Sequence, residues 1–335
     1  MLFSKFTALI EAPHVCARVV AQDRNSYQIK IEDAELRAEL SGKFRHTNKD
    51  PNTYPVVGDY VAVLISAGSA LIEQVSPRSN LFARRGIYGS HIMQAIAANI
   101  DTLFLVSAIN RDFNLRRIER YLVAAAACEI PCAIILTKVD LVSDRESFIV
   151  AAQSVAQDAP VIAVSAICHE GLELLSPFCG ESKTIAFVGS SGVGKSTLIN
   201  SISDSANLPV AEVRFGDDKG KHTTTRRCML FLNDGTAIID TPGMREFALA
   251  DADEGLNQTF ADVSEQAKLC RFRDCKHEEE PGCEVRDQVD PDRLNSWRKL
   301  EREAAFEARK SDRLLAAAEK QKWKAIHKEA KKRMR

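Results

Sequence analysis

The sequence predicts a multidomain protein: an N-terminal β-barrel, a central doubly wound α/β domain and a C-terminal helical domain that binds a metal ion. Three observations predict this fold class. Short runs that alternate apolar and polar residues fill residues 13–76. From residue 102 onward, strand and helix patterns alternate around a glycine-rich loop. A dense group of three cysteines and one histidine follows at residues 270–283. A chain of 335 residues is long enough for two or three domains.

The N-terminal region is expected to be all-β. Five short strands separated by polar and Gly/Pro-rich segments fit a small barrel such as an OB-fold, an architecture that often binds RNA or DNA. The segment Lys43–Asn52 is rich in basic side chains around Phe44. It is either a loop that contacts nucleic acid or a solvated hairpin. The five predicted strands are HVCARVVAQ, SYQIKIE, AELRAEL, GDYVAVLI and ALIEQV.

The central region is expected to be a doubly wound α/β domain, preceded by a connector over residues 77–100. Helices are predicted over Leu115–Cys128 and Asp144–Gln157, between apolar strand-like runs. Ligands of such sheets bind at the carboxyl ends of the strands, and each motif described next follows such an end. The predicted strands are TLFLVSA, CAIILT, PVIAVSA, TIAFV, CMLFLN and GTAIID. The predicted domains span residues 1–80, 81–250 and 251–335.

A phosphate-binding loop follows the predicted strand TIAFV. The run GSSGVGKS matches the pattern G-x-x-x-x-G-K-[S/T] between a strand and a helix. Its backbone N–H groups can wrap phosphates, Lys195 can reach the β and γ phosphates, and the Ser196 hydroxyl can ligate Mg²⁺. A glycine-rich turn without a ligand is the alternative. The predicted phosphate contacts are Gly189, Ser190, Ser191, Gly192, Val193, Gly194, Lys195 and Ser196, with Lys195 also assigned to catalysis.

Two further motifs favour GTP over ATP. Thr137-Lys138-Val139-Asp140 resembles the N-K-x-D motif, whose aspartate accepts two hydrogen bonds that guanine can donate and adenine cannot. The Lys138 stem is expected to pack over the base. Thr137 replaces the usual asparagine, so an amide that helps to anchor the phosphate loop is lost. Ser165-Ala166 resembles the companion S-A motif, whose backbone meets the guanine O6 atom.

A D-x-x-G sequence, Asp240-Thr-Pro-Gly243, ends the predicted strand GTAIID. Asp240 is expected to hold Mg²⁺, and the Gly243 N–H group can bond the γ phosphate, so that this loop senses its presence. A plain strand-to-turn segment is the alternative. The base motifs precede the phosphate loop in this chain, whereas they follow it in most GTPases. A sheet whose chain ends lie close together can be cut and rejoined without moving its site, which predicts a circular permutation.

The switch and the attacking water are the least defined parts of the predicted site. One of the threonines at 223–225 is expected to complete the Mg²⁺ shell. The choice among them is open, and Thr224 is assigned. Met244 stands where many GTPases have a glutamine that orients water, so slow intrinsic hydrolysis is expected. His222 is the candidate for orienting or deprotonating the water; a surface histidine on a loop is the alternative.

The Cys/His cluster is expected to hold one structural Zn²⁺ ion. Three thiolates and one imidazole form a closed tetrahedral ligand set with no open position, which argues against catalysis by the metal. Reduced surface cysteines are the alternative. The predicted ligands are Cys270, Cys275, His277 and Cys283.

Charge and composition bound the partners and the compartment. The net charge is −1, yet residues 298–335 hold 14 Lys and Arg against 6 Asp and Glu, and this asymmetry predicts a polyanionic partner. The tail lies on RNA phosphates or is a solvated charged segment. No apolar run is long enough to span a membrane and no signal-peptide pattern is present. The scattered cysteines fit reduced thiols, so a cytoplasmic protein is expected. No heptad seam is present, so a monomer is expected.

Together these motifs resemble the ribosome small-subunit-dependent GTPase A family of circularly permuted GTPases. The resemblance covers nearly the whole chain and includes the run CRFRDCKHEEEPGC. It implies a factor that binds the small ribosomal subunit and its rRNA late in maturation, hydrolyses GTP to GDP when bound, and then leaves. It also implies the guanine contacts, phosphate contacts and zinc ligands assigned above. The alternatives are a zinc-containing P-loop ATPase and a nucleotide-sensing RNA-binding protein.

Overall fold

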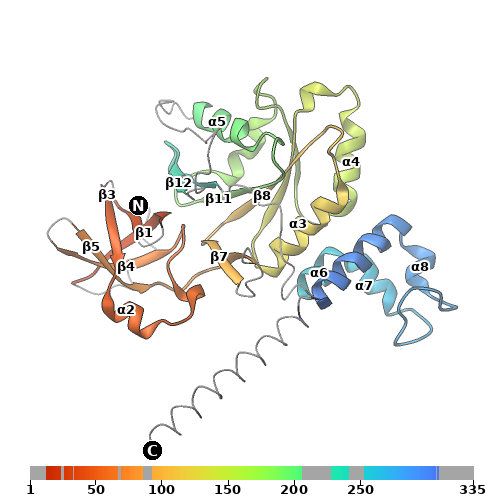
Figure 1. Cartoon of the computed structure of the whole chain (residues 1–335). Coiled ribbons are helices and arrows are strands. Elements are labelled where there is room, and N and C mark those ends of the chain that lie inside the picture. The colour runs from red at the N-terminus through yellow and green to blue at the C-terminus, as the bar shows by residue number, and fades with distance from the viewer. Residues whose placement is uncertain are drawn as a thin grey trace, which may run out of the picture. The chain divides into compact units, whose positions relative to one another are not determined.

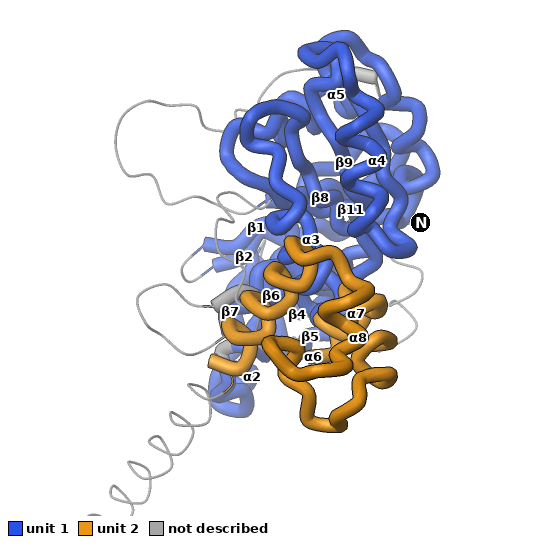
Figure 2. Tube along the Cα trace, turned by 90° about the vertical axis from the view of Figure 1, so that its right-hand side faces the viewer, with its two compact units in different colours: residues 1–84, 94–247 blue, residues 85–93, 248–335 orange. Residues whose placement is uncertain are grey.

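The structure is a computed structural model in which the chain forms two compact units (Figure 2). Unit 1 comprises residues 1–84 and 94–247, and unit 2 comprises residues 85–93 and 248–335. The residues that the structure describes are 13–23, 26–32, 34–66, 69–85, 93–205, 228–240, 253–306 and 308.

Unit 1 begins with a closed five-stranded barrel, as predicted. Its strands are β1 (Val15–Gln22), β2 (Tyr27–Ile31), β3 (Ala34–Leu40), β4 (Tyr60–Ser66) and β5 (Ser69–Val75). The strand order is β1-β2-β3-β5-β4, and β4 pairs back with β1 to close the barrel. All neighbours are antiparallel except β3 and β5. The barrel core holds Ile29, Val61 and Ile72, all fully buried.

The segment expected to be a basic loop begins as a helix, α2 (Gly42–Thr47). The Ser41 hydroxyl accepts a hydrogen bond from the Phe44 N–H group at 3.0 Å, which caps the helix. Phe44 is 4% exposed and packs edge-on against Tyr54, with ring centroids 5.8 Å apart. The interpretation of Phe44 as an aromatic for nucleic-acid contact is therefore wrong, because its ring lies in the barrel core.

The connector also holds structure that its sequence did not predict. Strands β6 (Leu81–Arg85) and β7 (Met93–Ala98) pair in a two-stranded sheet. Just before them, Arg78 donates to both carboxylate oxygens of Asp59 at 2.8 Å. Asp59 is fully buried, and a buried carboxylate requires such a partner. This pair fixes the start of the connector to the barrel.

The rest of unit 1 is an α/β sheet with the order β10-β9-β8-β11-β13-β12. Neighbouring strands are parallel from β10 through β9, β8 and β11 to β13, and β12 at the end of the sheet runs antiparallel to β13. The pairing of Ala21 with Cys228 joins this sheet to the barrel. The strands are β8 (Thr102–Ala108), β9 (Cys132–Thr137), β10 (Val161–Val164), β11 (Thr184–Val188), β12 (Cys228–Phe231) and β13 (Ala237–Asp240). The helices are α3 (Leu115–Ala127), α4 (Arg145–Ala156) and α5 (Lys195–Ser205), with short 3₁₀ turns at Pro51–Thr53, Val139–Leu141 and Leu172–Phe178.

Alternate residues of each strand face the two layers of helices, which makes the sheet doubly wound (Figure 1). Leu103 and Leu105 of β8 share a core with Ile118 of α3. Phe104 of the same strand shares the opposite core with Leu198 of α5. The chain leaves β8 toward β9 but leaves β11 toward β13, so the winding direction reverses between β8 and β11. Such a reversal opens a crevice for a ligand at the carboxyl ends of the strands.

Unit 2 is helical. Its helices are α6 (Asp253–Thr259), α7 (Ala261–Ala267) and α8 (Glu284–Gln288), followed by helical residues 291–306. Arg293 donates to both carboxylate oxygens of Asp262, at 2.6 and 2.7 Å, and lies over the Phe260 ring. The predicted helical C-terminal domain is confirmed as far as residue 306, and the basic end from residue 309 lies outside the described residues. None of the helices described is long and apolar enough to span a membrane.

Candidate nucleotide site and metal centre

The glycine-rich loop joins β11 to α5 at the crevice. Gly189 leaves β11 where a Cβ atom would lie 2.4 Å from the Val106 carbonyl oxygen, so only glycine allows this close approach. Gly194, just before the helix, has a φ of +95°. Lys195 donates from Nζ to the carbonyl oxygens of Gly189 and Ser190, at 2.7 and 2.8 Å. Its charge therefore lies within the loop, at the N-terminal end of α5, where an anion would bind.

The end of β9 holds this loop in place. The Thr137 hydroxyl donates to the Val193 carbonyl oxygen at 2.5 Å, and Thr137 is 2% exposed. The Lys138 ammonium donates to the Gly192 carbonyl oxygen at 2.7 Å. The expectation that threonine loses the anchor to the phosphate loop is therefore corrected: its hydroxyl makes that contact in place of an amide.

The other two base-motif residues meet across neighbouring strand ends. The Ser165 hydroxyl donates to an Asp140 carboxylate oxygen at 2.6 Å, and the Cys168 N–H group donates to the Ser165 hydroxyl at 3.1 Å. Val139 is buried in the core beside them, whereas Ala166 is half-buried. A carboxylate held by a fixed hydroxyl is oriented before a ligand arrives. The structure thus brings 137–140, 165–166 and 189–196 to one edge of the sheet.

The D-x-x-G strand ends beside the phosphate loop. Asp240 pairs with Phe187 of β11 in the parallel register, two residues before Gly189. Its side chain and the residues Gly243, Thr224 and His222 lie outside what the structure describes, as does Met244. The assignment of these residues to magnesium, the γ phosphate and the water stays a prediction.

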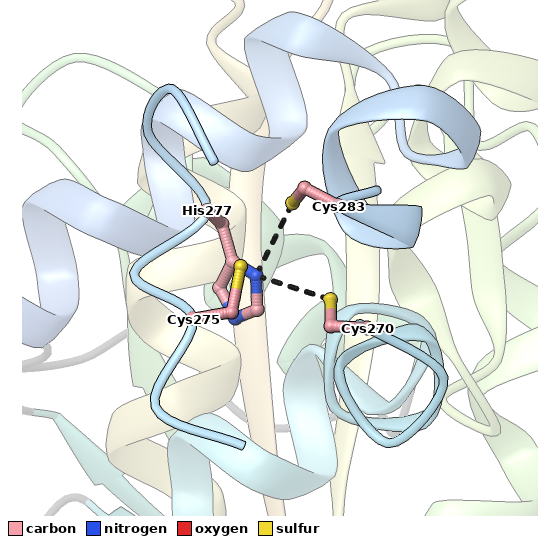
Figure 3. A group of neighbouring side chains, drawn as sticks. All are labelled: Cys270, Cys275, His277 and Cys283. Carbon is pink, nitrogen blue, oxygen red and sulfur yellow. Dashed lines mark hydrogen bonds between the residues drawn. The ribbon is translucent and has the colours of Figure 1, made fainter. Parts of the chain in front are cut away.

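The four predicted metal ligands lie together in unit 2 (Figure 3). Their ligand atoms all lie within 4.8 Å of one another. The His277 Nδ1 atom lies 3.6 Å from the Cys270 sulfur and 3.5 Å from the Cys283 sulfur. Cys270 ends the turn after α7, Cys275 and His277 lie on the following loop, and Cys283 caps α8.

The loop around the cluster is braced by its own backbone. Glu280 accepts hydrogen bonds from the N–H groups of Lys276, Glu278 and Glu279. These bonds lower the pKa of Glu280 to about 2. Burial lowers the pKa of His277, which favours the neutral imidazole that ligates metals. The donor set and its spacing can hold a metal ion.

The remaining six cysteines form no cluster. Each of the nine cysteines is a free thiol. Burial raises the pKa of both Cys16 and Cys132 to about 11, so these thiols are uncharged and unreactive. Cys168 is exposed.

Comparison with known proteins decides the family. The family model described as RsgA GTPase matches residues 75–250. A protein from Opitutus terrae named small ribosomal subunit biogenesis GTPase RsgA is 39% identical, covering 93% of this chain and 89% of its own. A relative from Listeria innocua with the name small ribosomal subunit biogenesis GTPase RsgA 1 is 40% identical, covering 96% and 94%.

This chain belongs to the RsgA GTPase family. Membership confirms the predicted GTP hydrolase activity and the resemblance drawn from the motifs. Among solved structures, YjeQ from Thermotoga maritima is similar with a TM-score of 0.61 and 26% identity, covering 86% of this chain and 97% of that one. YloQ, described as a circularly permuted GTPase, has a TM-score of 0.59 and 24% identity, covering 88% and 96%. These likenesses confirm the permuted fold of the RsgA GTPase family for this chain.

Two features of this RsgA-family site were not found from the sequence. One is the loop-anchoring role of Thr137, which was not expected because threonine stands where the motif usually has asparagine. The other is Arg117 of α3, whose guanidinium donates to the Ser190 hydroxyl at 2.7 Å. No motif marks Arg117, because a contact between α3 and the phosphate loop depends on the order of the strands. Only the amphipathic spacing of the predicted helix hinted at which of its faces lies toward the sheet.

Proposed function

We propose that this chain is a GTPase that acts in biogenesis of the small ribosomal subunit, binding the subunit late in its maturation and hydrolysing GTP in response. One observation carries the proposal: the guanine motif and the phosphate loop are hydrogen-bonded to each other through Thr137 and Lys138. This contact occurs in a chain whose relatives are named small ribosomal subunit biogenesis GTPases.

In the proposed site, guanine lies between the Lys138 stem and the Asp140 carboxylate, close to Val139 and the Ser165-Ala166 backbone. The phosphates lie in the loop 189–196. Asp140 has one oxygen held by Ser165, which fixes the carboxylate so that it can accept from the guanine edge. Adenine offers this carboxylate no matching pair of donors, because its N1 atom is an acceptor and its C2 atom carries no amino group, and this difference favours GTP.

Mg²⁺ is proposed to be held by Ser196, Thr224 and Asp240. These are hydroxyl and carboxylate oxygens, the hard ligands that Mg²⁺ prefers, and Ser196 is exposed at the first turn of α5. Mg²⁺ would neutralise charge that develops on the phosphates. Lys195 supplies a second positive charge to the β and γ phosphates. Gly243 donates its N–H group to the γ phosphate, and His222 orients or deprotonates the attacking water, because Met244 has no polar group for that role.

The metal in unit 2 is proposed to be Zn²⁺ in a structural role. A tetrahedral ion with bonds of about 2.3 Å to sulfur and about 2.05 Å to nitrogen places those ligand atoms about 3.6 Å apart. The observed separations of 3.6 and 3.5 Å between sulfur and His277 Nδ1 match that distance. Four protein ligands leave no position for water, so the ion stabilises the fold and takes no part in hydrolysis.

The partner proposed for the outer parts of the chain is rRNA of the small subunit. A barrel of this class offers a surface for nucleic acid, and the basic end of the chain supplies phosphate contacts. We propose domain limits of 1–80, 81–250 and 251–335, a monomer, and a cytoplasmic location, where small subunits are matured.

The proposal is tested by GTP turnover of the full chain titrated with purified small ribosomal subunits at two salt concentrations. We expect turnover to rise with the subunit and the rise to weaken at higher salt, because rRNA contacts release counterions. Large subunits serve as the matched control. Equal turnover with and without small subunits would remove the proposed stimulation.

A further inference from the structure

The phosphate loop has a further cationic contact besides those of Lys195 and Lys138. Arg117 lies on α3, outside every motif, and its Nη1 atom donates to the Ser190 hydroxyl at 2.7 Å and to the Asp112 carbonyl oxygen at 3.5 Å. The Ser190 side chain also hydrogen-bonds that of Tyr121. Arg117 and Tyr121 are four residues apart, so they lie on one face of α3. That face therefore holds one hydroxyl of the loop from two sides.

The position of α3 is fixed, which makes this contact a rigid one. Asn114 caps the helix by accepting from the Arg117 N–H group, and Ile118 and Leu122 are buried in the core against the sheet. Tyr121 is itself only 5% exposed. The guanidinium is thus held at the loop by a packed helix rather than by a solvated chain.

No carboxylate of the described residues makes a hydrogen bond or a salt bridge with the Arg117 side chain. Among the described residues, its hydrogen bonds go only to a hydroxyl and a carbonyl oxygen. The side chain is half-buried, and a cation partly removed from water favours an anion nearby. The nearest built anion site is the phosphate loop itself.

Lys195 shows why the start of the loop needs a support of its own. Its ammonium now donates to the carbonyl oxygens of Gly189 and Ser190, and it must leave them to reach the β and γ phosphates. The start of the loop then loses two hydrogen bonds as the nucleotide binds. The bonds from α3 to the Ser190 hydroxyl do not compete with the phosphates and can remain.

We propose that Arg117 is a positioning residue for nucleotide binding, acting through the Ser190 hydroxyl to keep the start of the phosphate loop in its receiving shape when Lys195 moves to the phosphates. The inference rests on the proposed nucleotide site. It assigns a role to a residue that contacts the loop from outside the nucleotide-binding motifs.

The test is a double-mutant cycle on the full chain, with dissociation constants for GDP and GTP and the KM and kcat of GTP turnover. Ser190→Ala removes both supports and should weaken binding of either nucleotide about tenfold, as expected for loss of a hydrogen bond to a charged group. Arg117→Met should weaken it severalfold. In the Ser190→Ala background, Arg117→Met should have no further effect, because the partner is gone.

We expect these variants to have a higher KM and a kcat within about twofold of the wild-type value, since the interaction serves the ground state and the transition state alike. A merely structural role would instead lower the active fraction and leave KM unchanged. Arg117→Lys should recover part of the loss, because lysine can still donate to Ser190. The matched control is Arg116→Met, which removes the same charge from an exposed neighbour on the same helix and should change nothing.

The proposal would be overturned if the losses of nucleotide affinity in the two single variants multiplied in the double variant. It would also be overturned if the Ser190→Ala variant bound both nucleotides as tightly as the wild type. The second result decides the matter even if Arg117→Met fails to fold. The Lys195→Ala variant distinguishes failure of the proposed nucleotide site from failure of the role of Arg117. If it too binds nucleotide normally, the proposed site itself is wrong; if it alone loses binding, only the role of Arg117 fails.

Discussion

The metal cluster and the nucleotide site are built in opposite ways. All four candidate metal ligands come from residues 270–283, and the loop that carries them is braced by its own glutamate, Glu280. The nucleotide site is assembled from strand ends spread over 137–240, and sheet topology brings them together. The proposed ion would therefore close a short loop, whereas the nucleotide site depends on a core that exists without its ligand.

This difference sets the largest expected effect, which is loss of the metal. Chelation, or Cys283→Ser, should unfold the loop and loosen the helices of unit 2, because binding of a structural Zn²⁺ supplies about 10–16 kcal/mol in small zinc domains. GTP binding by unit 1 should persist. Far-ultraviolet circular dichroism and metal analysis measure the loss of helix and of metal, and nucleotide titration measures GTP binding.

Cys168→Ser is the control for that experiment, because Cys168 is an exposed thiol outside the cluster. It should retain the ion. An unchanged dichroism spectrum after complete removal of the metal would show that the cluster does not hold unit 2 together.

The next effect in size is catalytic. Lys195→Ala should lower GTP turnover about 10²–10³-fold, the usual result of removing one donor that stabilises developing charge. The fold should remain, because the hydrogen bonds of the Lys195 ammonium to Gly189 and Ser190 lie within its own loop. Turnover and thermal unfolding of the same preparation measure both. Full activity in the variant would place the phosphates elsewhere.

A smaller effect is expected at the base. Asp140→Asn should weaken GDP binding about 10–100-fold, since a hydrogen-bond acceptor for guanine becomes a donor. ADP binding should change little. Competition of GDP against ADP for the wild type and the variant gives the ratio. If the preference for GDP survives unchanged, Asp140 does not contact the base.

The smallest effect concerns the link between the two halves of the site. Thr137→Val removes the hydroxyl that bonds the Val193 carbonyl oxygen while keeping the side-chain shape. The loss of one neutral hydrogen bond, about 1 kcal/mol, should raise the dissociation constant for GTP about fivefold. Thr137→Ser keeps the hydroxyl and serves as the control. Equal affinity of Thr137→Val and Thr137→Ser for GTP would mean that the loop needs no anchor from β9.

The sequence predicted best what depends on neighbouring residues. The strands Thr102–Ala108, Cys132–Thr137 and Thr184–Val188 were predicted with their observed bounds, because continuous apolar runs between turn signals indicate buried strands. Capped helices were equally clear: Asp144 accepts from the Ser147 N–H group at the start of α4. The spacing of cysteines and histidine likewise named all members of the metal cluster.

What the sequence missed depends on contacts between distant residues. The basic appearance of Lys43–Asn52 concealed the burial of Phe44, although Ser41 is a helix-capping residue that could have indicated α2. No local pattern encodes the parallel pairing of β3 with β5 in the barrel. The bonds of Thr137 and Arg117 to the phosphate loop span 56 and 73 residues, so they follow from topology alone.

The most direct test of the nucleotide site is a crystal structure of the full chain with Mg²⁺ and a non-hydrolysable GTP analogue. We predict guanine between the Lys138 stem and the Asp140 carboxylate, the phosphates within residues 189–196, and Lys195 moved from the loop carbonyls to the β and γ phosphates. A nucleotide bound away from Asp140, or phosphates outside that loop, would contradict it.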